Sequence, residues 1–150
     1  EPDVKALGDA LRAGEGAYQL DLSGNVRVSD RSVDALLSSA RKGRALIIRL
    51  ALDGTGVSHP KAREARREAG ASAVTAACMA LDGGGEDVTV DLSDCGIGDE
   101  EVTRVAEHAW RTTSVTEILL SRNPMITDAG GDALRAALEG HSRLNPACSC

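Results

Sequence analysis

Aromatic residues are almost missing from this 150-residue chain, which has no Phe, one Trp and one Tyr. A core must therefore be built from Leu, Ile, Val and Ala, and the stacking platforms of single-stranded nucleic acid binders are lacking. Positive charge is also scarce, because 17 Lys and Arg face 23 Asp and Glu for a formal net charge of −6. Generic DNA binding rests on positive charge, so we expect no nucleic-acid partner.

Long apolar runs are missing as well. No segment approaches the roughly 18 apolar residues of a membrane helix, and residues 1–20 have no secretory-signal pattern. The four cysteines are too few and too widely spaced for a typical secreted disulfide scaffold. Cys78 and Cys95 stand in apolar segments and are predicted to be reduced core residues. These features favour a cytoplasmic protein without a membrane partner.

One short pattern occurs four times in the chain: YQLDLSGN at 18–25, IRLALDGT at 48–55, TVDLSDC at 89–95 and EILLSRN at 117–123. Aliphatic and polar residues alternate in each copy, which predicts a short strand with one buried face. The predicted inward aliphatic residues are Leu20 and Leu22, Leu50 and Leu52, Val90 and Leu92, and Ile118 and Leu120.

A helical pattern follows each strand, as in Val33, Leu36, Leu37 and Ala40 after the first copy. Successive strands are 30, 40 and 28 residues apart, counted between positions 20, 50, 90 and 118. This strand–turn–helix unit resembles the leucine-rich repeat, and its length is similar to that of the ribonuclease-inhibitor-like class.

The resemblance implies an α/β fold: a leucine-rich repeat solenoid, forming a curved right-handed β-α superhelix. Parallel strands would line its concave face and helices its convex face. We expect a single domain over 1–150, with the four strand rungs side by side. Its predicted units are 17–45, 46–86, 87–114 and 115–144, with 1–16 as a helical part-repeat or cap.

Two details of the repeat lead to further expectations. The amides of Asn25 and Asn123 are predicted to bond the backbone of the turn after each strand, and Thr55 and Cys95 are smaller substitutes. The second unit is about 12 residues longer than a 28-residue repeat. We expect residues 59–70 to form an inserted short helix ending at Gly70, separate from the usual helix at 73–80. The chain would be either a fragment of a longer repeat protein or one capped by its own terminal helices.

Catalytic patterns are weak. The three histidines fall in different units, no HExxH or GxSxG motif occurs, and His141 with Cys148 and Cys150 matches no paired zinc spacing. We therefore expect a protein that is not an enzyme and needs neither cofactor nor metal.

The strand residues that alternate with the aliphatic ones form the main candidate binding surface. This predicted concave face is mildly acidic, and it is either a solubility device or a recognition surface for a protein with a basic patch. Its residues are Gln19, Asp21, Arg49, Asp53, Thr89, Asp91, Glu117 and Leu119. The predicted insertion is a second candidate, either a solvated helix with internal ion pairs or a basic contact element. Its cations are Lys61, Arg63, Arg66 and Arg67.

The family resemblance implies a protein–protein interaction module, acting as a non-catalytic scaffold or regulator. One alternative is a tropomodulin-like, actin-associated protein of the cytoskeleton, since TTSVTEILLS at 112–121 is somewhat similar to that group. A second alternative is a Ran-GTPase-activator-like regulator, although no loop arginine can be matched to that group.

Overall fold

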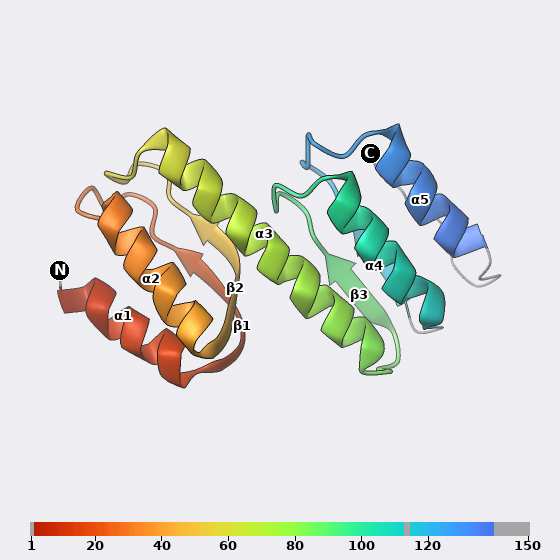
Figure 1. Ribbon diagram of the computed structural model, residues 1–150, viewed down its shortest axis with the longest axis horizontal. Helices are drawn as coiled ribbons and strands as arrows, with labels where there is room; N and C mark the ends of the chain where they lie inside the picture. The colour runs from red at the N-terminus through yellow and green to blue at the C-terminus, as the bar shows by residue number, and fades with distance from the viewer. Residues whose placement is uncertain (1, 113–114, 140–150) are drawn as a thin grey trace. The chain divides into compact units, whose positions relative to one another are not determined.

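The computed structural model describes residues 2–112 and 115–139 of the chain (Figure 1). In this part, helices and short parallel strands alternate along the sequence. The chain divides into two compact units at Ala73/Val74, inside the helix α3, His59–Asp82. Each unit is therefore described by itself.

The first unit begins with α1 (Pro2–Ala13) and β1 (Glu15–Asp21). These are followed by α2 (Asp30–Lys42), β2 (Arg44–Ala51) and the first part of α3. Strands β1 and β2 pair in parallel, and α1 packs against both α2 and β2.

The second unit contains the end of α3 and four further elements. They are β3 (Val88–Asp91), α4 (Asp99–Arg111), β4 (Val115–Leu119) and α5 (Asp128–Glu139). Strands β3 and β4 pair in parallel, and α4 packs against α5. Both units therefore repeat one strand–turn–helix arrangement.

The alternation along the strands is confirmed for four of the eight predicted inward residues. Leu50, Leu52, Val90 and Leu92 are at most 5% exposed, whereas Leu20, Leu22, Ile118 and Leu120 are half-buried. Between the buried pairs, Asp91 is exposed and Ala51 is half-buried. Neighbouring copies align as expected, because Leu20 lies opposite Leu50 and Val90 opposite Ile118. In the first unit, Leu50 and Leu52 belong to one buried core cluster with Val33, Leu36 and Leu37 of α2, which forms without any Phe.

The strands form two two-stranded sheets in the described residues, with β2 and β3 in different sheets. The expected break at Gly70 is wrong, because α3 runs unbroken for 24 residues and includes both predicted helices. Gly70 costs a helix about 1 kcal/mol relative to Ala. A buried stripe on both sides of it, Ala65, Ala69, Val74 and Leu81, offsets this cost.

Candidate interaction surfaces

The predicted strand-face residues lie together in pairs within each unit. In the first sheet Gln19 is opposite Arg49, and in the second Thr89 is opposite Glu117. Parallel pairing holds such side chains at fixed separation on one face. Each sheet therefore presents a short row of positioned polar side chains.

Asp21 and Asp91 have the same structural task in the two sheets. Each accepts a hydrogen bond from the backbone N–H two residues later, at Ser23 or Ser93, with an N–O distance of 2.9 Å. The Ser23 backbone bond also lowers the pKa of Asp21. Both carboxylates are exposed, so they stabilise the turn while adding negative charge to the surface.

The remaining acidic residues of the predicted face differ in their contacts. Asp53 forms an ion pair with Arg66 of α3, at 3.2 Å between Arg66 Nη2 and Asp53 Oδ1. Glu117 is exposed and forms no ion pair with any described residue. Glu117 is therefore the carboxylate best placed to meet a partner.

The turn of the second sheet depends on Asn123, as predicted. Its Nδ2 donates to the carbonyl oxygens of Leu92 (2.8 Å) and Leu120 (2.9 Å). Its Oδ1 accepts from the backbone N–H groups of Cys95 (3.1 Å) and Ile97 (3.3 Å). One buried amide thus joins two successive repeats.

The turn of the first sheet uses a different pair. Asn25 donates from Nδ2 to the carbonyl of Leu22 in its own repeat, at 2.9 Å. Thr55 donates to the carbonyl of Leu52 at 2.6 Å and accepts from the N–H of Val57 at 3.4 Å. Both side chains bond their own turn, as expected.

Asp30 and Asp99, which the sequence analysis did not identify, each connect the start of one helix to the start of the helix in the next repeat. Asp30 accepts from both the backbone N–H and the hydroxyl of Ser58, each at 2.7 Å. Asp99 does the same with Thr127 at 2.7 Å, and also accepts from the N–H of Gly130 at 3.2 Å. These bonds lower the pKa of both carboxyls, the hydroxyl bond being the largest cause. An Asp at the first helical position, 28 residues before a Ser or Thr, was the available signal.

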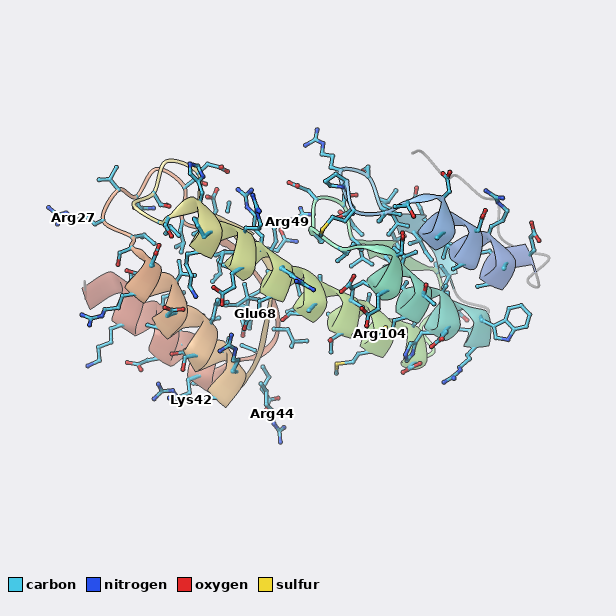
Figure 2. All side chains as sticks on the ribbon, turned by 45° about the horizontal axis from the view of Figure 1, so that its top comes forward. Arg27, Lys42, Arg44, Arg49, Glu68 and Arg104 are labelled. Atoms are coloured by element: carbon cyan, nitrogen blue, oxygen red, sulfur yellow. The ribbon has the colours of Figure 1, made fainter. Side chains whose placement is uncertain are left out.

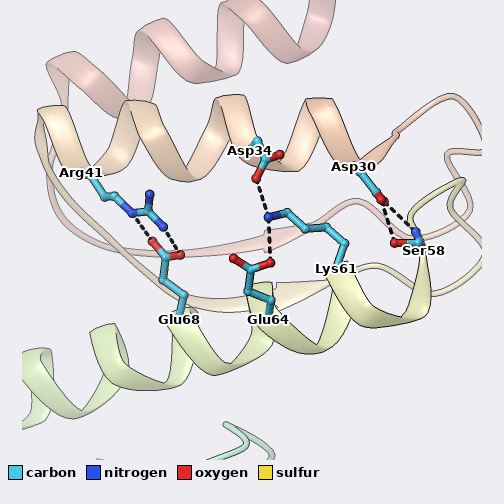
Figure 3. Close-up of polar contacts among 7 residues, drawn as sticks. All are labelled: Asp30, Asp34, Arg41, Ser58, Lys61, Glu64 and Glu68. Atoms are coloured by element: carbon cyan, nitrogen blue, oxygen red, sulfur yellow. Dashed lines mark hydrogen bonds and ion pairs between the residues drawn. The ribbon is translucent and has the colours of Figure 1, made fainter.

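The predicted basic insertion is tied to α2 (Figure 3). Lys61 has a side chain only 15% exposed and lies between Asp34 and Glu64, with its Nζ 2.9 Å from Glu64 Oε2. Hydrogen bonding to Asp34, followed by that to Glu64, raises the pKa of Lys61. Arg41 of α2 binds Glu68 of α3 with two guanidinium nitrogens, Nε at 2.7 Å. These contacts hold the first part of α3 against α2.

The four cations of the predicted insertion differ in whether they form ion pairs. Among the described residues, Lys61 forms the one ion pair inside the helix, with Glu64, while Lys61 and Arg66 also pair with Asp34 and Asp53, which lie outside the predicted element. Arg63 and Arg67 are exposed and pair with no described side chain. A binding role for these cations stays a prediction.

Other reactive side chains are placed as follows. Cys78 and Cys95 are buried and free, and burial is the main cause that raises the pKa of Cys78. His108 Nδ1 lies 2.8 Å from Asp82 Oδ1, which links α4 to the end of α3. His141, Cys148 and Cys150 lie outside the described residues.

The described residues contain neither a cluster suited to a metal ion nor a helix suited to a membrane. No group of three or more His, Cys, Asp or Glu side chains is placed to hold a metal ion in residues 2–112 and 115–139. Over the same residues, no helix combines the length and the apolarity needed to cross a bilayer.

Comparison with known proteins points to the repeat. The family model of the leucine-rich repeat matches residues 88–100, which include β3 and the turn before α4. Searches of curated proteins and of solved structures returned no match. The chain thus contains a leucine-rich repeat sequence in an α/β fold with parallel strands, and that motif is commonly a non-enzymatic protein-interaction module.

Proposed function

We propose that this chain is a protein-interaction module of the ribonuclease-inhibitor-like class of leucine-rich repeat proteins. Its repeats would stack as one curved solenoid and act as a non-catalytic scaffold or regulator in the cytoplasm. Support comes from the parallel pairing of β1 with β2 and of β3 with β4, a helix after each strand, and the repeat match at 88–100.

One observation carries the proposal: in both sheets, polar side chains that are exposed or half-buried lie opposite one another in register, next to buried or half-buried aliphatic residues. Gln19 and Arg49 are so arranged in one sheet, and Thr89 and Glu117 in the other. Side chains fixed on paired strands lose little conformational entropy when a partner binds. Each sheet face is therefore suited to recognition.

The charge of these faces indicates the kind of partner. Asp21, Asp91 and Glu117 are exposed carboxylates, and Asp53 forms an ion pair with Arg66. A partner with a basic patch would complement them, with effects mainly on association rate and specificity.

The best test alters side chains that the fold does not need. Asp21 and Asp91 support the turns, so the double variant Gln19→Lys/Glu117→Lys is preferable. Its matched control is Ala136→Lys/Glu139→Lys, which makes the same charge change on exposed residues of α5. Proteins captured from a cytosolic extract would be quantified for wild type and both variants, and the main captured protein then purified for direct titration.

We expect the strand-face variant to weaken that complex about tenfold, which is 1.4 kcal/mol, and the control to leave it within about twofold. Equal binding by all three proteins would refute the proposal. Actin-filament co-sedimentation and GTP hydrolysis with small GTPases, run in parallel, distinguish the tropomodulin-like and Ran-GTPase-activator-like alternatives.

A further inference from the structure

A groove runs between α1 and α2, entirely within the first unit. Apart from Val4, its uncharged lining residues are small, among them Gly8 of α1 and Ala35 and Ser39 of α2. A Cβ at Gly8 would lie 3.0 Å from Ser39 Oγ, so the two helices approach each other closely there. Close approach of small residues leaves a shallow channel whose walls are the two helix backbones.

Four cations line this groove: Lys5 and Arg12 from α1, and Arg31 and Lys42 from α2. Asp9 is the single carboxylate among its lining residues. None of the four cations forms an ion pair with a described residue, and all four are exposed. A chain with a net charge of −6 thus has a site where four cations stand with a single carboxylate.

The cations stand near both ends of the groove. Lys5 and Arg12 are seven residues apart on α1 and Arg31 and Lys42 eleven apart on α2, so they span about 10 Å and about 16 Å of helix. Figure 2 shows Lys42 at the C-terminal end of α2, with Arg27 beyond its N-terminal end. Carboxylates seven and eleven residues apart on a helical ligand would match these spans.

We propose that this groove is a second protein-binding site, which takes an acidic helical segment of a partner protein. The cations at its ends bind the carboxylates of the ligand. The small residues between them, Gly8, Ala35 and Ser39, let the ligand backbone lie close to α1 and α2. This site goes beyond the strand-face function, because it uses the helix side of the first unit and the opposite charge.

A peptide fits the groove better than a nucleic acid or an anionic membrane. Both of these present extended arrays of negative charge, which are bound by long basic tracks, whereas the four cations flank a channel of about 16 Å. The small residues between them offer close packing without aromatic stacking.

The probe for the test is a fluorescein-labelled, Ala-rich helical peptide with Glu residues seven and eleven positions apart. Its control has Lys in place of Glu, and vesicles rich in phosphatidylserine serve as the lipid competitor. Binding is measured by fluorescence anisotropy at low and high salt. The variant Arg12→Glu/Arg31→Glu removes groove cations, whereas Arg104→Glu/Arg111→Glu makes the same charge change at exposed residues of α4, outside the groove.

We expect the wild type to bind the acidic peptide more weakly at high salt than at low salt, and to show no binding of the basic peptide. The groove variant should bind at least about tenfold more weakly, and the control variant within about twofold of wild type. If circular dichroism shows that the groove variant misfolds, Lys5→Gln/Lys42→Gln replaces it, with an expected loss of about threefold.

Equal losses in the groove and control variants would overturn the proposal, because the attraction would then be general. Absence of peptide binding, or displacement of the peptide by vesicles, would also overturn it. The strand-face variant Gln19→Lys/Glu117→Lys should bind the acidic peptide like wild type, so failure of the strand-face function and failure of this site can be told apart.

Discussion

In both units an Asn amide bonds the backbone carbonyl at the end of the first strand, but the repeat that supplies this Asn differs. In the first unit an Asn comes in the first repeat and a Thr in the second, and Asn25 supplies its own amide to the Leu22 carbonyl. In the second unit a Cys comes first, and its thiol cannot replace that amide. Asn123 from the following repeat reaches back to the equivalent Leu92 carbonyl instead.

In both units, one amide per pair of repeats bonds the carbonyl at the end of the first strand, and either repeat can supply it. Asn123 should contribute more to the free energy of unfolding than Asn25. Asn25 is exposed and bonds within its own turn, whereas Asn123 is 7% exposed and bonds both repeats. Coupling between repeats should therefore rest on the turn side chain in the second unit and much less so in the first.

The largest expected effect follows from breaking the second turn. Asn123→Ala leaves the Leu92 carbonyl and the N–H groups of Cys95 and Ile97 without their partner. Each buried group without a hydrogen bond costs stability, so we expect a loss of about 3 kcal/mol in the free energy of unfolding. Urea denaturation measures it, and hydrogen exchange should show the amides of Cys95 and Ile97 losing protection. Normal protection of both amides would contradict the proposed coupling.

Smaller losses are expected from the first turn. Asn25→Ala and Thr55→Ala each remove bonds to the side chain's own turn, and we expect about 1 kcal/mol for each. The same urea titrations measure them beside Asn123→Ala. A loss at Asn25 as large as that at Asn123 would remove the contrast between the units.

Much of this arrangement could be predicted from the sequence. Period-two alternation identified Leu50, Leu52, Val90 and Leu92 as buried and predicted the alignment of β1 with β2 and of β3 with β4, because strand geometry leaves little choice once one face must be buried. The turn amides followed from the polar residue at a fixed distance after each strand. The break at Gly70 was wrong because a local helix signal was outweighed by buried residues on both sides of it, Ala69 and Val74 among them.

Other features depended on contacts between residues that are far apart in sequence. The pairing of Lys61 with Asp34 and of Arg66 with Asp53 compensates two of the four cations of the predicted insertion, and it depends on how the first part of α3 packs within the first unit. The basic groove could not be predicted either, since its cations belong to two helices in stretches with acidic residues between them. Mutual orientation of helices decides which charges share a surface.

The smallest expected difference concerns the aspartates that link successive helix starts, since both are solvent-accessible. Asp99 accepts three hydrogen bonds and Asp30 two, and the pKa of each lies below the ordinary value of 3.8 in the folded chain. A carboxyl with a lowered folded pKa contributes stability above the unfolded pKa, and this contribution is lost as pH falls through the folded value.

Stability should therefore decline as pH is lowered from about 5 towards 3, and Asp99→Asn should reduce that decline more than Asp30→Asn. Asn keeps one acceptor oxygen but presents an N–H group to the Thr127 donors, so both variants should also be less stable than wild type near neutral pH. Urea titrations at several pH values measure this. Identical pH slopes for wild type and Asp99→Asn would show that the carboxylate is not the group that titrates. If Asp30→Asn changed the pH dependence of stability more than Asp99→Asn, the aspartate link between repeats would be stronger in the first unit. The stronger coupling of the second unit would then come from Asn123 alone.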